Sequence, residues 1–219
     1  MTLHRISTFS LLAFVAACIG SDAPPADTTT AAAPPAPAAA PALDAAPAQF
    51  QVRLETSKGP IVLAVHRDWS PNGVDRFYHL VETGYFDDVR FFRVVPGFVV
   101  QFGMHGDPAR NAQWSENGLI DEPVKQTNKR GTVTYAKSSM PNSRSSQLFI
   151  NLGDNSMLDQ QGFVPFAEVI EGMDVVDKLY SGYGDEPTGR QPEIAAEGNA
   201  FLNRTYPKLD FIRTAKVVK

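Results

Sequence analysis

The chain has 219 residues, of which 43% are apolar and 20% are charged, as is usual for one globular domain with additional segments. The sequence shows no internal repeat. Its formal net charge of -4 and pI near 5.6 provide no broad basic field for a phosphate backbone, so we expect no nucleic acid partner.

The first 17 residues have the features of an export signal. His4 and Arg5 precede an apolar run over 11–17, which is far shorter than the roughly 20 residues that span a bilayer. The run ends in Val-Ala-Ala-Cys at 15–18, which resembles the lipobox of bacterial lipoproteins and implies lipidation of Cys18. Cys18 is the only cysteine and cannot form an internal disulfide, which favours an anchor over a redox role. The alternative is a chance cysteine after an ordinary cleavable signal.

The segment after the cysteine has the composition of a tether. Between residues 19 and 48 the chain contains 13 Ala and 7 Pro and no aromatic residue, so it cannot build a core. Proline at this density favours extended, polyproline-like chain. We therefore expect a signal at 1–17, an Ala/Pro-rich tether at 18–49 and one folded domain at 50–219. The protein would be held on the extracytoplasmic, periplasmic side of a bacterial membrane, inner or outer.

The folded domain begins with an alternating pattern. Residues 51–55 and 61–65 flank a Ser-Lys-Gly-Pro turn at 57–60, which predicts an antiparallel hairpin. Ser70 and Pro71 have the form of a helix start, and Gly84 of a helix end. Between them an apolar stripe at helical spacing indicates a helix that packs on a sheet: Val74, Phe77, Leu80 and Val81.

Further strands are predicted at 90–95, 98–102, 132–135, 147–151, 163–170 and 209–217, and a second helix at 173–180. This mainly β pattern of eight strands and two helices fits a closed antiparallel barrel, although periodicity alone allows a sandwich equally. The segment 182–207 matches no simple element, but its aromatic and aliphatic residues predict that it packs on the barrel.

Two motifs indicate the function. Residues 91–103 read FFRVVPGFVVQFG, in which a strand, a Pro-Gly turn and a second strand would bring Arg93, Phe98 and Gln101 together. Residues 147–151 read QLFIN. In order and spacing the two segments resemble the signatures of the cyclophilins, which are peptidyl-prolyl cis-trans isomerases. The resemblance implies a closed eight-stranded antiparallel barrel capped by two helices, and rotation about Xaa-Pro bonds in exported polypeptides.

The chemistry of this reaction explains why an arginine is useful. Rotation breaks no bond, but it twists an amide against a barrier of about 18 to 20 kcal/mol. Twisting localises a lone pair on the prolyl nitrogen, and a guanidinium can donate to that nitrogen only in the twisted form. Arg93 would therefore bind the transition state more tightly than the ground state. By resemblance, Gln101 orients the arginine.

The resemblance also implies a set of substrate-binding residues. Phe98 and Phe149 would form the walls of a cup for the proline ring, Ala136 and Lys137 would pair with the peptide backbone, and Gln147 would border a neighbouring subsite. Met157 replaces the tryptophan of cyclosporin-sensitive members, so we expect weak cyclosporin binding. The full expected set is Phe91, Phe98, Val99, Ala136, Lys137, Gln147, Phe149, Met157, Leu158 and Phe163.

Other chemistries have little support in the sequence. The histidines lack metal-ligand spacing, and no serine lies in a Gly-x-Ser-x-Gly elbow, so we expect no metal, no cofactor and no hydrolase. We expect a monomer whose partners are proline-containing polypeptides and, through the lipid anchor, a membrane. One alternative is a peptide-binding module or holdase with incidental turnover, against which Arg93 and Gln101 argue. Another is a lipocalin-like ligand barrel, which would need a hollow interior.

Overall fold

The computed structural model describes residues 43–218, so the expected signal, Cys18 and most of the expected tether lie outside the described residues. Nine strands form one antiparallel sheet. They are β1 Gln49–Thr56, β2 Gly59–His66, β3 Val89–Arg90, β4 Arg93–Val95, β5 Val99–Phe102, β6 Thr132–Tyr135, β7 Leu148–Asn151, β8 Pro165–Glu171 and β9 Phe211–Val218. Their order across the sheet is β3-β9-β1-β2-β8-β6-β7-β5-β4.

The sheet is a curled half-barrel, so the prediction of a closed eight-stranded barrel is wrong. The strand expected at 90–95 is two strands, β3 and β4, which lie at opposite edges of the sheet. Between them Phe91 and Phe92 are both fully buried, whereas consecutive residues of a strand point to opposite faces. Phe91 packs in the main core and Phe92 in a second cluster, so the chain leaves one edge and joins the other.

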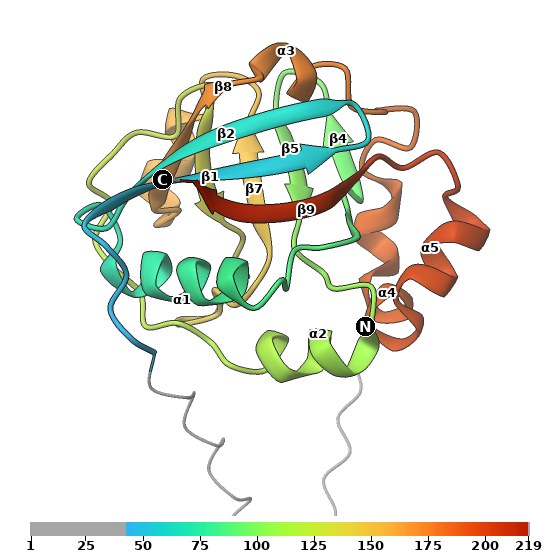
Figure 1. Cartoon of the computed structure of the whole chain (residues 1–219), viewed down its shortest axis with the longest axis horizontal. Coiled ribbons are helices and arrows are strands. Elements are labelled where there is room, and N and C mark those ends of the chain that lie inside the picture. The colour runs from blue at the N-terminus through green and yellow to red at the C-terminus, as the bar shows by residue number, and fades with distance from the viewer. Residues whose placement is uncertain (1–42, 219) are drawn as a thin grey trace, which may run out of the picture. The chain divides into compact units, whose positions relative to one another are not determined.

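The prediction of two capping helices is also wrong. The helical elements are α1 Pro71–Glu82, α2 Pro108–Ser115, η1 Ser156–Gln161, α3 Met173–Val176, η2 Glu186–Arg190, α4 Gln191–Glu197 and α5 Asn199–Thr205. Of the predicted pair, α1 is confirmed, whereas the helix expected at 173–180 is the single turn α3. Figure 1 shows α1 beside β1 and β9, and α4 and α5 together at the side of the sheet that carries β4. Among the described helices, none is long and apolar enough to cross a bilayer.

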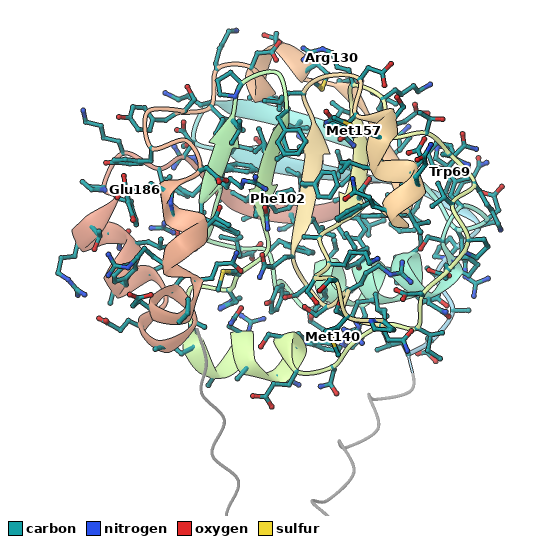
Figure 2. The ribbon with its side chains drawn as sticks, turned by 180° about the vertical axis from the view of Figure 1, so that it is seen from behind. Trp69, Phe102, Arg130, Met140, Met157 and Glu186 are labelled. Carbon is teal, nitrogen blue, oxygen red and sulfur yellow. The ribbon has the colours of Figure 1, made fainter. Side chains whose placement is uncertain are left out.

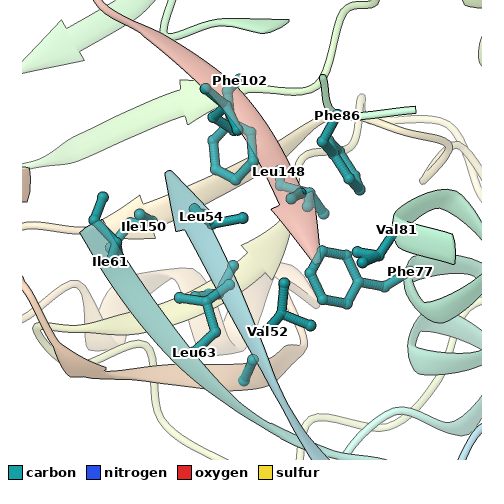
Figure 3. Packing of buried hydrophobic residues seen from close by; sticks show 14 of the residues in the cluster. Val52, Leu54, Ile61, Leu63, Phe77, Val81, Phe86, Phe102, Leu148 and Ile150 are labelled. Atoms are coloured by element: carbon teal, nitrogen blue, oxygen red, sulfur yellow. The ribbon is translucent and has the colours of Figure 1, made fainter. Parts of the chain in front are cut away.

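The main core fills the concave side of the sheet. Phe77 and Val81 of α1 point towards Val52 of β1 and Leu63 of β2, and Phe86 packs beside Phe77 with ring centroids 5.5 Å apart (Figure 3). Burying each such side chain contributes about 1.5 to 3 kcal/mol. The interior is occupied by side chains, which gives the lipocalin-like alternative no support.

The segment 182–207 packs on the sheet, as predicted. Its helices α4 and α5 bury Ile194, Phe201 and Leu202 against Phe92 and Met104, which follow β3 and β5. The result is a second apolar cluster next to the main core. The segment is thereby held against the start of β4, where Arg93 lies.

The start of α1 is held by a distant carboxylate. Ser70 lies at the N-cap position, but its hydroxyl donates to Glu122 and does not cap the helix. Glu122 also accepts the backbone N–H of Asn72 at 2.8 Å, which supplies a partner for a free helix N–H. The fully buried Arg144 donates to the same carboxylate at 3.1 Å. This buried ion pair joins the loop before β7 to the helix.

Candidate active site

A cavity of about 220 Å³ opens on the face of the sheet that points away from the main core. Nine of its lining residues belong to the set expected from the sequence, and two come from the segment 182–207. The expected ones are Arg93, Phe98, Val99, Gln101, Ala136, Lys137, Phe149, Leu158 and Phe163, and the additional ones are Thr188 and Gln191.

Strand register explains why these side chains share a face. Arg93 of β4 lies directly opposite Gln101 of β5, which lies opposite Phe149 of β7. Paired residues of neighbouring strands project to the same side of a sheet. The next row along these strands, Val94, Val100 and Ile150, points the other way and lies in the main core. Alternation therefore places one apolar row inside and one functional row outside.

The floor of the cavity is apolar. Val99, Phe149 and Leu158 are buried in a small cluster of their own, with Phe98, Ala136 and Phe163 packed around them. The rings of Phe149 and Phe163 meet edge to face, with centroids 5.8 Å apart. The part of the site away from Arg93 can therefore take a small apolar ring and remove it from water.

A chain of amide hydrogen bonds forms the polar side. Arg93 Nη1 donates to Gln101 Oε1 at 3.1 Å, and Gln101 Nε2 donates to Gln147 Oε1 at 2.9 Å. Gln147 Nε2 in turn donates to Gln191 Oε1 at 2.8 Å. Gln101 and Gln147 each accept one of these hydrogen bonds and donate another, so the orientation of Gln101 is fixed by the residues on either side of it. Its oxygen consequently faces the guanidinium.

Arg93 has two further contacts. Its Nε donates to the carboxylate of Asp185, and its guanidinium carbon lies 5.5 Å from the centroid of the Phe98 ring. The arginine side chain is 22% exposed, so it is shielded but open to the cavity. The cation thus lies between the apolar floor and a carboxylate that the sequence did not lead us to expect.

Lys137 and Ala136 lie at the rim. Lys137 Nζ donates to the carbonyl of Gln161 at 2.9 Å and lies 5.6 Å from the centroid of the Phe163 ring. The backbone N–H of Ala136 donates to the carbonyl of Gln147, so a peptide would have to pair with other main-chain groups here. Gln147 borders a neighbouring polar hollow of about 340 Å³ and not the apolar cavity itself.

Besides Gln147, two more of the expected binding residues lie outside the cavity. Phe91 is fully buried in the main core, 5.4 Å from the Phe102 ring, so its assignment to substrate binding is corrected: a peptide cannot reach it. Met157 is 55% exposed on η1 and does not line the cavity, whereas its neighbour Leu158 does. Figure 2, which views the molecule from behind, shows Met157 and Glu186 on the two sides that flank the strands.

The sequence reasoning missed Asp185, Thr188 and Gln191. They lie 92 or more residues along the chain from Arg93 and belong to a segment that matches no simple pattern, so no spacing linked them to the two motifs. A single polar side chain carries no signal in the sequence of the residue that it contacts in the fold. Within residues 43–218, no group of three His, Cys, Asp or Glu side chains is placed to hold a metal ion.

Comparisons with known proteins agree on one family. Residues 51–197 match the family model of the cyclophilin type peptidyl-prolyl cis-trans isomerases. Peptidyl-prolyl cis-trans isomerase A of Dickeya dadantii is 36% identical over 148 residues, which cover 62% of this chain and 73% of that protein. Peptidyl-prolyl cis-trans isomerase B of Escherichia coli is 31% identical over 169 residues, 74% of this chain and 94% of that protein.

Solved structures support the fold. The cyclophilin AquaCyp293 from Hirschia baltica superposes with a TM-score of 0.57 at 18% identity, over 78% of this chain and 75% of that one. A cyclophilin type isomerase of Cryptosporidium parvum, crystallised in the presence of the dipeptide Ala-Pro, gives a TM-score of 0.56 at 19% identity, over 77% of this chain and 99% of that one.

Proposed function

The chain belongs to the family of cyclophilin type peptidyl-prolyl cis-trans isomerases and is an isomerase of Xaa-Pro bonds, and from this premise we propose how and where it acts. The proposed site is the cavity between Arg93 and Phe163. Its substrates are proline-containing segments of exported proteins, and the enzyme works as a monomer held to a bacterial membrane by a lipid on Cys18.

The proline ring would occupy the apolar floor formed around Phe149 and Leu158. In this position the ring is removed from water while the amide that precedes it lies towards Arg93. The planar amide is more polar than the twisted one, so partial desolvation costs the ground state more than the transition state. The crystallisation of the Cryptosporidium cyclophilin in the presence of Ala-Pro supports a proline dipeptide as the occupant.

Arg93 would act on the twisted amide. With Nε and Nη1 already bonded to Asp185 and Gln101, its remaining N–H groups can donate to the prolyl nitrogen once the lone pair is localised. A hydrogen bond from a charged donor is worth about 1.5 to 3 kcal/mol, which corresponds to roughly ten- to a hundredfold in rate. The observation that carries this proposal is the placement of one oriented guanidinium beside a small apolar cavity of about 220 Å³.

The decisive experiment measures the isomerisation rate of an Xaa-Pro tetrapeptide by the full chain and by Arg93→Ala. We expect clear acceleration by the wild type and a loss of at least about tenfold in the variant, with an unchanged circular dichroism spectrum. A folded wild type without acceleration would instead make the protein a peptide-binding module or holdase. Equal acceleration by the two proteins would reject the role of Arg93 but not the isomerase activity.

The membrane proposal needs a separate experiment. The sequence at 15–18 supports it, because an apolar run that ends in a lone cysteine suits lipid attachment. Expression of the chain and of Cys18→Ser in a bacterium fed labelled palmitate should give label and membrane fractionation for the wild type only. A wild type that is exported without label would identify the segment as an ordinary cleavable signal.

A further inference from the structure

The segment 182–207 contributes directly to the site. Asp185 accepts a hydrogen bond from Arg93, Thr188 lines the cavity, and Gln191 accepts from Gln147 at the end of the amide chain. These contacts join one segment to both ends of the row that runs from Arg93 to Gln147. The segment therefore has a part in arranging the polar side of the cavity.

The contact with Asp185 restrains the guanidinium in a particular way. Gln101 holds Nη1 on one edge and Asp185 holds Nε on the adjoining edge, while the Phe98 ring lies 5.5 Å from the guanidinium carbon. Among the residues that the structure describes, none accepts a hydrogen bond from Nη2. A planar group fixed on two edges has one orientation, and here the unoccupied nitrogen is the one left for a substrate.

The carboxylate itself is held in place. Thr188 Oγ1 donates to Asp185 Oδ1 at 3.2 Å, and the next residue, Glu186, accepts from the Tyr206 hydroxyl at 3.2 Å. Ile194 and Phe201 of the same segment are buried against Phe92, the residue that precedes Arg93. The apolar cluster thus fixes the distance between the backbone that carries Asp185 and the backbone that carries Arg93.

We propose that Asp185 is a positioning residue for catalysis, which holds Arg93 so that its free N–H groups face the prolyl nitrogen. This rests on the proposed role of Arg93. Without the carboxylate, a long flexible side chain would keep one hydrogen-bond partner and one ring contact, and would sample other rotamers. A small displacement of a catalytic group lowers the rate of the chemical step much more than it weakens substrate binding.

The opposite reading is that Asp185 restrains the arginine at the expense of activity. A carboxylate that engages the guanidinium also lowers its net positive potential towards the cavity. The two readings predict opposite signs for the change in kcat when the charge is removed. Removal lowers kcat if Asp185 positions Arg93, and raises it if Asp185 competes with the substrate.

The test compares Asp185→Asn, Asp185→Glu and the control Glu193→Gln in the full chain. Glu193 is a carboxylate of the same segment whose ion pair, with Arg190, lies apart from the cavity lining. Positioning predicts that kcat falls about three- to tenfold in Asp185→Asn with KM within about twofold, and that Asp185→Glu recovers part of the loss. Glu193→Gln should match the wild type.

The same substitution in an Arg93→Ala background separates this proposal from the proposed function. If Asp185 acts through Arg93, then Asp185→Asn changes kcat by less than about 1.5-fold once the arginine is absent. An equal loss in both backgrounds, an unchanged kcat or a raised kcat in the single variant would each overturn the proposal. An Arg93→Ala variant as active as the wild type would reject the role of Arg93, and with it that of Asp185.

Discussion

Gln101 lies directly opposite Arg93 in the ladder of β4 and β5, and its side-chain oxygen accepts a 3.1 Å hydrogen bond from Arg93 Nη1. The pairing puts the two side chains on one face without any contribution from loops. Since Gln101 also donates to Gln147, its amide cannot rotate by half a turn without losing both bonds. The orientation of the guanidinium therefore depends on a residue that need not touch the reacting bond.

This relationship predicts a graded effect along the amide chain. Gln101→Leu should lower kcat by about tenfold, because it removes a charge-assisted hydrogen bond worth about 1.5 to 3 kcal/mol and leaves Gln147 without its donor. Gln147→Leu, one bond further from Arg93, should have a smaller effect. Steady-state rates with an Xaa-Pro tetrapeptide measure both, and an equal or reversed ranking would contradict orientation through the chain.

The apolar floor predicts a different kinetic signature. Phe163 meets Phe149 edge to face and lines the cavity, but it is only partly buried. Phe163→Ala should raise KM several-fold through lost contact with the proline ring while kcat changes less, because ring contacts are made in ground state and transition state alike. Ile170→Ala, an exposed aliphatic outside the cavity lining, is the control. A fall in kcat with KM unchanged would show that Phe163 acts on the chemical step.

The strands could be predicted because their alternation is strong. The expected strand at 132–135 coincides with β6. In the hairpin, β1 and β2 are each only a few residues longer than the strands predicted at 51–55 and 61–65. The break between β3 and β4 could not be predicted, because Phe91 and Phe92 are both apolar and their pattern does not say that they enter two different clusters. The same missed break bears on the prediction of a closed barrel, which is wrong because β3 and β4 lie at opposite edges of an open sheet.

Helix starts gave a mixed signal. Ser70-Pro71 and Asp107-Pro108 have the same form, yet only Asp107 caps its helix, where it accepts from Ala109 N at 2.8 Å. Of the two, only the helix that starts at Ser70-Pro71 was predicted from the sequence. In the candidate site, the two motifs identified the row of side chains on β4, β5 and β7 that contains Arg93, Gln101 and Phe149. Asp185 was missed because its contact with Arg93 depends on how a Gly- and Pro-containing segment packs.

The buried ion pair behind α1 predicts a large loss of stability. The side chain of Arg144 is fully buried and that of Glu122 is nearly so. The Glu122 carboxylate also accepts a hydrogen bond from the Ser70 hydroxyl. Arg144→Met would leave a buried carboxylate without its counter-charge, which costs about 3 to 5 kcal/mol. Urea unfolding of the variant checks this. The double variant with Glu122→Gln should recover part of the loss, and equal stability of wild type and Arg144→Met would contradict a role for the pair.

Asp75 predicts how stability depends on pH. Its carboxylate accepts from Arg67 Nε at 2.7 Å and from the backbone N–H of Ala46 at 2.8 Å, which ties the chain before β1 to α1. Burial acts to raise the pKa of Asp75, but the hydrogen bonds from Arg67 and Ala46 outweigh it and hold the pKa below its usual value. The folded state therefore favours the ionised form more than the unfolded state does.

The sign of the pH effect follows from linkage. A depressed folded-state pKa stabilises the protein above the unfolded-state pKa, which is about 3.9, and this stabilisation is lost as the pH falls through the folded-state value. Asp75→Asn should cost about 1.5 to 3 kcal/mol at neutral pH, the worth of a charged hydrogen bond. The difference from the wild type should shrink as the pH falls below about 4. Glu82→Gln, at the exposed end of the same helix, is the control. Urea unfolding between pH 3 and pH 7 measures both variants, and a constant difference for Asp75→Asn would mean that its charge has no part in the stabilisation.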